Sequence, residues 1–587
     1  MQNNLLSKIR NYICAAKITS PNCKTHKKGE QWSPKYFATM YLILYECVSF
    51  LQPVYAGIDS YILSLVVNKV YGDTNTTMFM NPILCKIFAT MHVMMPFSDV
   101  YSVLGEILMG LAVWLLIYFI CMNTRNIYEK IGLCLIATLV LFWKEARIYD
   151  NFTNVASFLT TVGIVVLSIQ MRKRTQKKIF MFLGATLIWS GMMWRQNAAL
   201  LGIPFMLLDM ICYWFQDTNA SIRKIQKIFT VYGIAWIGMI ILVGVNAWYI
   251  AQIPDAVTYN NARSALVDYH PVPYEQIKNP AYSRNDYNYI LHMILGDTEY
   301  TTTKLLSEIA QSSQPVKPAL LNLETLLYTV FGLRIYGSYW LVLYGFTSII
   351  LLIMHKKQRK YVGIRMALSY VGLFCISYGF VYIGRLTLSV LVAIYMYALL
   401  ISSIIITSDY PCEGNWSVQH IKKEGLIIII GLSMLLGYRW ITMPKAVTLQ
   451  SSLTANYHTK QELLKWENDD SIYFWDAYDF SVIFAEPFYQ VGKLYPREAL
   501  AKNIQLGEWT YHQPYFDEYL QRIGIKNPIK TLLQSSNAYF VGSEEIATII
   551  QTYYKEHFHI SVSKTKVEDF DDISIWSFEA KTLSISS

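Results

Sequence analysis

Long apolar runs alternate with short basic segments over most of this chain. Each run holds about 20 residues, enough to cross a hydrocarbon core of roughly 30 Å as a helix. The pattern predicts about eleven membrane spans, at roughly 36–56, 102–121, 131–145, 154–171, 179–194, 198–215, 229–251, 336–354, 361–383, 386–407 and 425–443.

The basic segments recur at every second connection between these runs, and they set the expected orientation. They include the Arg172-Lys-Arg-Thr-Gln-Lys-Lys178 run and the His355-Lys-Lys-Gln-Arg-Lys360 run. Loops rich in lysine and arginine stay on the cytoplasmic side of a membrane. The chain is therefore expected to begin inside, with residues 1–35 as a basic cytoplasmic tail, and to end outside.

Under this orientation three polar pieces face outward, at 57–101, 252–335 and 444–587. The first contains two short apolar stretches, 61–71 and 82–95, which are predicted to form helices lying in the membrane interface. The second mixes proline, tyrosine, asparagine and aspartate, and loops of this length tend to carry a function.

The last piece changes composition and predicts a folded domain. Strands are predicted at 471–475, 538–541 and 573–578, and Ser543 is expected to cap a helix that starts with Glu544 and Glu545. The expected fold is mainly α: a polytopic membrane helical bundle over 36–443, with outer loops 57–101 and 252–335, followed by an extracytoplasmic α/β domain at 444–587. The expected location is the plasma membrane, with the lipid bilayer as a partner.

Composition supports this fold class and excludes several functions. The chain is 53% hydrophobic and 16% charged, too poor in charge for an ordinary soluble protein. Its net charge of +9 lies mostly in the short loops, so no nucleic-acid partner is expected. The sequence contains no Walker-type phosphate loop, no Gly-x-Ser-x-Gly elbow and no His-Glu-x-x-His helix, which disfavours ATP-driven transport and the common serine and zinc hydrolases.

The first candidate for chemistry is Asp59, the only charge in Gln52-Pro-Val-Tyr-Ala-Gly-Ile-Asp-Ser60, where the first apolar run ends. A carboxylate at the outer surface could act as a general base on an acceptor hydroxyl, or hold a divalent cation beside a phosphate. The simpler interpretation is a polar residue that ends a helix.

Several basic and acidic residues are expected at the same membrane face. Lys144, Glu145 and Arg147 lie at the outer end of the third span, Arg195 ends the fifth, and Arg385 lies at the outer end of the ninth or the start of the tenth. Arginine binds phosphate through a planar fork, and three such sites could together hold a pyrophosphate or a phosphodiester. The alternative is that these side chains only reach toward lipid headgroups.

The second outer loop adds Arg263 and Asp268, residue types that suit sugar or phosphate contacts. Glu46 falls near the middle of the first span, where a charge must be protonated, paired or solvated in a cavity. It favours an alternative function, a proton-coupled transporter or flippase for a glycan or lipid. Glu106 is a further candidate acid, and Asp209 is expected only to mark the cytoplasmic interface.

Together these residues resemble the C-type (GT-C) superfamily of membrane glycosyltransferases, and in particular uncharacterised bacterial glucosyltransferase-like proteins. The resemblance covers roughly 36–407 and rests on short pieces: Met80-Asn-Pro-Ile-Leu84, Trp143-Lys-Glu145, Arg195-Gln-Asn197, Asn261-Ala-Arg-Ser264, Asp268-Tyr269, Asn285-Asp286 and Gly384-Arg385.

The resemblance implies transfer of a sugar from a polyprenyl-phosphate carrier to an acceptor outside the cytoplasm, a cell-envelope glycan, lipid or protein. By this analogy Asp59 is the base or the metal ligand, and Arg195 and Arg385 contact the carrier phosphate. Family members often have two acids in the first loop, but here Ser60 follows Asp59, so the second acid is open between Glu145 and Glu106. The resemblance also leaves open whether a divalent cation, Mg²⁺ or Mn²⁺, takes part.

Overall fold

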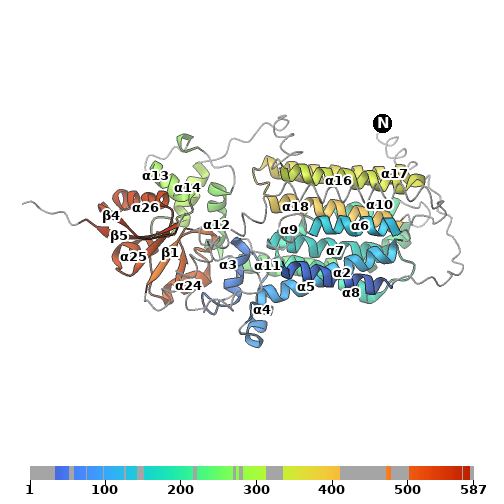
Figure 1. The fold of residues 1–587 in the computed structure, drawn as a ribbon, viewed down its shortest axis with the longest axis horizontal. Helices are drawn as coiled ribbons and strands as arrows, with labels where there is room; N and C mark the ends of the chain where they lie inside the picture. Colours follow the sequence, from blue (N-terminus) through green and yellow to red (C-terminus); the bar gives the residue numbers. More distant parts are fainter. Residues whose placement is uncertain are drawn as a thin grey trace, which may run out of the picture.

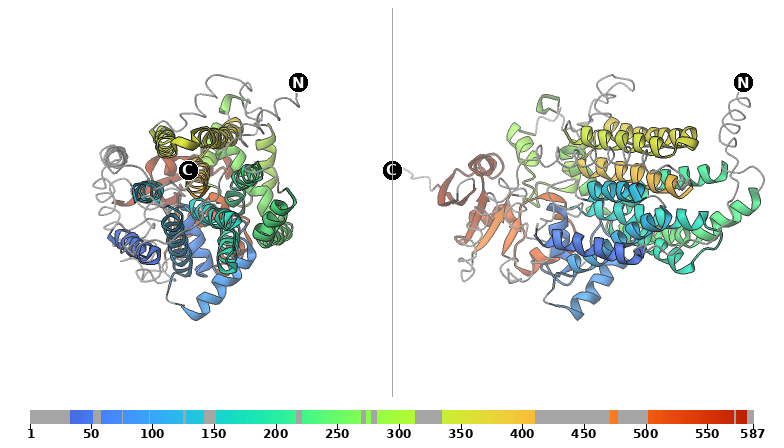
Figure 2. Two further views of the ribbon diagram at one scale, coloured as in Figure 1. Left: turned by 90° about the vertical axis from the view of Figure 1, so that its right-hand side faces the viewer. Right: turned by 45° about the vertical axis from the view of Figure 1, so that its right-hand side comes forward.

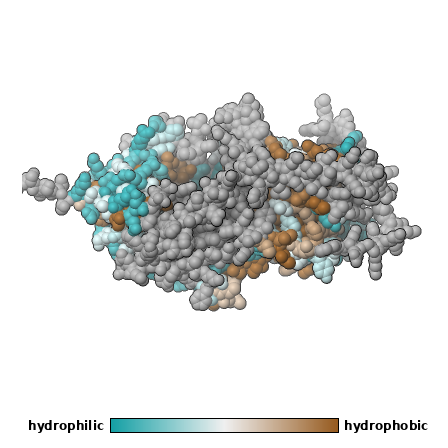
Figure 3. All heavy atoms as spheres, in the orientation of Figure 1, coloured by the Kyte–Doolittle hydropathy of each residue, from teal (hydrophilic) through white to brown (hydrophobic). Residues whose placement is uncertain are grey.

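The protein is elongated, with a helical bundle at one end and a small sheet at the other (Figure 1). The computed structural model describes residues 33–51, 58–74, 76–96, 98–124, 127–141, 151–215, 221–268, 273–276, 282–312, 335–409, 471–476, 502–570 and 573–581. Hydrophilic residues gather at the sheet end, and hydrophobic patches lie along the helical part (Figure 3).

The bundle contains the helices expected from ten of the eleven predicted spans, which lie side by side in both views of Figure 2. They are α2 (Pro34–Leu51), α5 (Val100–Asn123), α6 (Ile127–Leu141), α7 (Phe152–Arg172), α8 (Lys178–Trp194), α9 (Gln196–Leu200), α10 (Ile203–Phe215), α11 (Ser221–Ile250), α16 (Ile335–Met354), α17 (Arg359–Tyr382), α18 (Leu388–Met396) and α19 (Ser402–Asp409). The eleventh, 425–443, lies outside the described residues.

Six helical stretches among the described residues are long and apolar enough to cross a membrane. Large apolar side chains on α11 point outward, including Ile237, Ile240 and Trp248, each more than half exposed. Such a face is unfavourable in water and suits a hydrocarbon surround. The structure is therefore that of a membrane protein, while the number of spans and the orientation stay predictions.

Helix α7 forms the centre of the bundle, and every residue from Phe152 to Met171 is buried. It packs closely on α8 because glycines line both sides of the contact. A Cβ added at Gly163 would lie 2.6 Å from the carbonyl oxygen of Gly184. Small residues let membrane helices approach closely and gain dispersion contacts.

Two arginines and two aspartates form a buried network at the end of the bundle away from the sheet. Arg172 donates to both carboxylate oxygens of Asp209, at 3.0 and 2.7 Å. Arg365 contacts Asp209 as well and lies 3.3 Å from Asp409. The expectation that Asp209 only marks an interface is therefore wrong, because its carboxylate ties α7, α10 and α17 together inside the protein.

The sheet has five strands in the order β2-β1-β3-β5-β4. β1 (Ile472–Trp475), β3 (Ala538–Gly542) and β5 (Ile573–Ala580) confirm the predicted strands, and α26 (Glu544–His557) confirms the helix capped by Ser543. β2 (Asn503–Gln505) and β4 (Val562–Phe570) were not predicted. β1 pairs in parallel with β2 and β3, whereas β5 is antiparallel to β3 and β4. The helices α24 (Pro514–Arg522) and α25 (Pro528–Gln534) complete the described part of this C-terminal domain, the tail domain.

The described part of the loop over residues 252–335 packs on this sheet domain and not on the bundle alone. It forms α12 (Pro254–Val267), α13 (Arg284–Leu291) and α14 (Thr303–Ser312). Asp297, in the same loop, accepts hydrogen bonds from Asn527 at 2.7 Å and from Tyr553 at 2.8 Å. Loop and tail therefore build one structural unit.

Two short helices of the first outer loop lie between the bundle and this unit (Figure 1). α3 (Ile58–Val67) is buried along Ile62–Val67. It therefore packs inside the protein and, over these residues, does not show the exposed apolar face expected of an interfacial helix. α4 (Pro82–Met94) exposes Val93 and Met94 and keeps the apolar outer face expected of an interfacial helix.

Replacing Asp209 with asparagine should destabilise the protein, because two buried guanidinium groups lose their shared carboxylate. Breaking a buried ion pair costs about 3–5 kcal/mol. We expect a clear fall in the apparent melting temperature of the detergent-purified protein. Asp73→Asn, at a side chain that is 95% exposed, serves as the matched control. Equal melting temperatures of the two variants would show that Asp209 does not stabilise the fold.

Candidate active site

Asp59 lies in the first turn of α3, where the bundle meets the tail domain. The indole nitrogen of Trp509 donates a hydrogen bond of 3.0 Å to its Oδ1. The next residue, Ser60, accepts a hydrogen bond from the backbone nitrogen of Phe152 at the start of α7. The carboxylate is thus held by a residue 450 positions later in the chain, and the neighbouring Ser60 ties the start of α3 to the core helix of the bundle.

Arg195 occupies the break between α8 and α9, on the same side of the molecule. Its guanidinium lies over the ring of Phe152 at 3.9 Å and near the ring of Phe79 at 5.9 Å. Its charge interacts with those of Asp59, Asp268 and Arg385. Among the described residues, however, no side chain forms a hydrogen bond or ion pair with this guanidinium.

Arg263 and Arg385 share the carboxylate of Asp268. This aspartate caps the C-terminal end of α12, where Ser264 donates to it at 2.7 Å. Arg263 lies 3.1 Å from its Oδ2 and Arg385 lies 3.6 Å from the same atom. Arg263 is buried and Arg385 is partly open to solvent, so only the second can readily meet a ligand.

Glu508 is a member of this cluster that sequence reasoning missed. It begins the short helix η6 (Glu508–Thr510) of the tail, and its carboxylate lies 3.4 Å from Arg263. Burial raises the pKa of Glu508 to about 7, and the nearby charges of Asp59 and Asp268 act in the same direction, against the effect of Arg263. Trp509, the next residue, holds Asp59 and packs edge-on to Phe79 at 4.7 Å.

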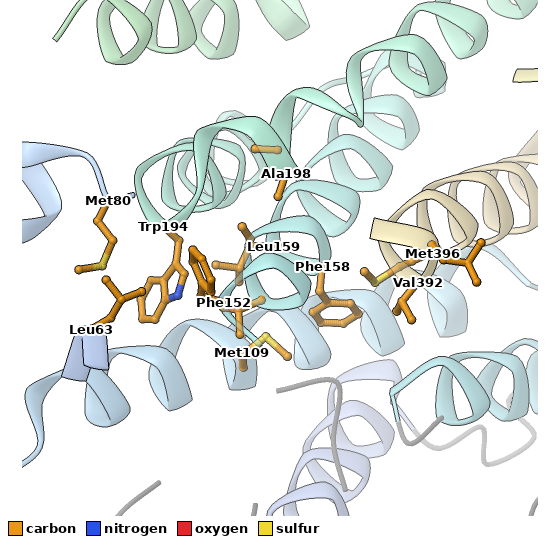
Figure 4. Close-up of a cluster of buried hydrophobic side chains, with 14 of the residues drawn as sticks. Leu63, Met80, Met109, Phe152, Phe158, Leu159, Trp194, Ala198, Val392 and Met396 are labelled. Carbon is orange, nitrogen blue, oxygen red and sulfur yellow. The ribbon is translucent and has the colours of Figure 1, made fainter. Parts of the chain in front are cut away.

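A dense apolar cluster supports the charged residues from the bundle side (Figure 4). Phe152, Trp194, Met80 and Leu63 converge there from α7, α8, the α3–α4 segment and α3. Tyr101 of α5 packs against Trp194 with ring centroids 5.0 Å apart. The acid and arginine side chains therefore border on closely packed apolar side chains. This surround lowers the local dielectric constant and strengthens the interactions between the charges.

The structure thus brings together Asp59, Arg195, Arg263, Asp268 and Arg385, five of the seven residues named from sequence. Lys144 and Glu145 lie outside the described residues, so their place in the site stays a prediction. Glu46 faces Gly110 across the α2–α5 contact, within the bundle.

A divalent cation at Asp59 finds little support in the residues that surround it. Among the described residues, three metal-ligating side chains come together only at Asp286, Glu556 and His557, between α13 and α26. One oxygen of Asp59 is already taken by Trp509, and two arginines occupy Asp268. Oxygen-rich, unshared ligands are what Mg²⁺ and Mn²⁺ need.

Comparison with known proteins gives a structural likeness but no match in sequence. No protein-family model matches the sequence, and no curated protein matches it. The chain is similar to ArnT from Cupriavidus metallidurans, whose crystal structure is described as bound to undecaprenyl phosphate. The two share 9% identity with a TM-score of 0.42, over 94% of this chain and 98% of that chain. So loose a superposition supports no conclusion on activity, and the function proposed below rests on the charged cluster.

Replacing Trp509 with phenylalanine should loosen Asp59 while it retains most of the ring packing against Phe79. A hydrogen bond to a charged group contributes about 1.5–3 kcal/mol, so the apparent melting temperature should fall. Trp248→Phe, at an exposed position of α11, is the control and should leave it unchanged. Thermal unfolding followed in detergent measures both; wild-type stability of Trp509→Phe would show that the hydrogen bond adds nothing.

Proposed function

We propose that the protein is a membrane glycosyltransferase that moves a sugar from a polyprenyl-phosphate carrier to an acceptor hydroxyl. One observation carries the proposal: Arg195 presents a guanidinium without a carboxylate partner among the described residues, next to Asp59 and at the junction of an apolar bundle and a polar domain. A lipid phosphate matches this site, because its phosphate carries negative charge and its chain is apolar.

Arg195 and Arg385 are the residues proposed to bind the carrier phosphate. The planar fork of arginine matches two phosphate oxygens, and a guanidinium held over an aromatic ring keeps its edge N–H groups free to donate. The Arg385 side chain lies 3.6 Å from Asp268 and is 36% exposed, so a phosphate oxygen can reach it. Arg263 is already held by Asp268 and Glu508, and we assign it the positioning of these two acids.

Asp59 is proposed to face the reacting carbon and the acceptor hydroxyl. Its negative charge stabilises the positive charge that develops on the sugar ring in an oxocarbenium-like transition state. It also orients the hydroxyl by accepting its hydrogen bond. Because Trp509 fixes one oxygen, the other is presented in a defined direction and little reorganisation is needed during the reaction.

The alternative, a proton-coupled transporter or flippase for a glycan or lipid, has one observation in its favour. The span from Gln196 to Phe215 is broken at Leu201–Gly202, and it meets a π-helical turn, Tyr397–Ile401, in the opposite helix. Broken helices near the midplane are typical of transporters. Here, however, Tyr397 donates to the freed carbonyl of Ala198 at 3.0 Å, so the break is closed by protein.

Asp59→Asn should abolish sugar transfer from a panel of polyprenyl-phosphate hexoses while leaving the protein inserted and folded. The neutral amide cannot stabilise a developing positive charge. Asp73→Asn is the matched control and should transfer like the wild type. Full transfer by Asp59→Asn would remove Asp59 from the reaction, and transport that persists in this variant but stops in Glu46→Gln would favour the alternative.

Arg195→Gln should weaken binding of undecaprenyl phosphate to the purified protein about tenfold or more, because a charge-assisted hydrogen bond to phosphate contributes roughly 1.5–3 kcal/mol. Arg195→Lys should recover only part of the affinity, since lysine lacks the fork. Arg174→Gln, at an exposed site on the opposite end of the bundle, is the control. Unchanged affinity in Arg195→Gln would contradict the phosphate site.

A further inference from the structure

Glu508 sits in a backbone conformation that side chains rarely adopt. Its φ angle is +72°, in the left-handed region, and it is 8% exposed. A non-glycine residue held there costs on the order of 1–3 kcal/mol and persists only when its surroundings enforce it, which is common at functional sites. The surroundings here are tight, because a Cβ at the preceding Gly507 would overlap the carbonyl oxygen of Met293.

The same short segment places two side chains in opposite directions within the cluster. Glu508 reaches Arg263 on α12, and Trp509 reaches Asp59 on α3. A backbone hydrogen bond of 2.6 Å from Leu295 to Leu506 anchors the segment to the outer loop just before this point. Residues 506–509 therefore deliver an acid and an aromatic ring from the tail domain to a site otherwise built by the bundle and its loop.

Four titratable groups face Glu508, and two of them are carboxylates that oppose its negative charge. They are Arg263 and Tyr259 of α12, Asp268 after α12, and Asp59 of α3. The Arg263 guanidinium, 3.4 Å away, and the backbone N–H of Trp509 favour its charged form. By contrast, Asp268 is held by two arginines and a serine, and Asp59 is held by an indole. Of the three acids, Glu508 is the one that lies in a buried segment with a left-handed backbone.

We propose that Glu508 is the proton acceptor of the transfer, an inference that rests on the proposed function. The O–H bond of the acceptor breaks and its proton passes to the Glu508 carboxylate, while the acceptor oxygen bonds to the anomeric carbon of the sugar. The bond from that carbon to the phosphate oxygen breaks, and its electron pair stays on the lipid phosphate beside Arg195 and Arg385. The protonated Glu508 then releases its proton to solvent.

The pH dependence has a defined sign. The pKa of Glu508 is raised to about 7, so the carboxylate that accepts the proton becomes available as pH rises through 7. Activity should rise over this interval. Folding stability should fall over the interval from the ordinary glutamate pKa of 4.5 to about 7, because the folded state holds the proton more tightly than the unfolded state.

The test compares Glu508→Gln with the wild type in full-length protein, with polyprenyl-phosphate hexoses as donors, on both sides of pH 7. We expect kcat to fall about 100-fold or more with little change in KM, and the rise of kcat through pH 7 to disappear. Glu508→Asp should recover part of the rate. Glu545→Gln, at an exposed glutamate in the first turn of α26, should behave like the wild type.

A purely structural role would give a different result. The glutamine oxygen can still accept from Arg263, so if Glu508 only positions that arginine, Glu508→Gln retains both its rate and its pH profile. That outcome overturns the proposal for Glu508 and leaves the glycosyltransferase standing, provided that the wild type transfers sugar. Absence of transfer in the wild type overturns the proposed function itself.

A second measurement needs no turnover. Calorimetric titration of undecaprenyl phosphate into the full-length protein, near pH 7 in two buffers of different ionisation enthalpy, counts the protons taken up on binding. The charge of the lipid phosphate should raise the pKa of Glu508 and cause uptake of a fraction of a proton in the wild type. Glu508→Gln should bind without this uptake; equal uptake in both proteins would contradict the assignment.

Discussion

The structure depends on the balance of three guanidinium groups and three carboxylates at the junction of bundle and tail. Asp59, Asp268 and Glu508 face Arg195, Arg263 and Arg385 on an apolar base. Charges removed from water are tolerated only when they are paired, so each of these groups restricts where the others can lie. Arg195 is the exception among them. Its charge interacts with that of Asp59, but its guanidinium forms no hydrogen bond or ion pair with any described side chain.

This balance makes the tail domain part of the site and not a separate appendage. Asp297, in the loop that follows α11, accepts a hydrogen bond from Tyr553 of α26, and His557 of α26 bonds to Asp286 of α13 at 2.6 Å. Arg522 of α24 reaches back to the backbone of Tyr71 beyond α3. These contacts set the distance between residues 507–509 and the bundle. A tail that detaches would remove Glu508 from Arg263 and Trp509 from Asp59 in one motion.

Sequence alone predicts the parts of this structure that depend on local pattern. Apolar runs predict the helices. The arginines at their ends were named as candidates because a charge near lipid is costly unless it is paired or binds a ligand. Asp59 was found for the same reason. Glu508 gave no such signal, since Gly507-Glu508-Trp509 is typical of a solvated turn, and its burial arises from Arg263, 245 positions away. The network at Asp209 was missed likewise, because its partners come from other helices.

Strand prediction had a similar limit. β2 has only three residues, and β4 carries Lys564 and Lys566, whose ammonium groups lie over the Trp576 ring, so neither strand shows an apolar alternation. Pairing with β1 and β5, and not a local apolar pattern, makes β2 and β4 strands. The site as a whole was therefore predictable from the bundle side and not from the tail side.

The most direct test of the central claim is an experimental structure of the full-length protein with undecaprenyl phosphate in a lipid nanodisc. The account predicts the phosphate within hydrogen-bonding distance of the Arg195 guanidinium, with Asp59 and Glu508 on the side open to an acceptor. A phosphate held elsewhere, with Arg195 still lying on Phe152 and bonded to nothing, would contradict it.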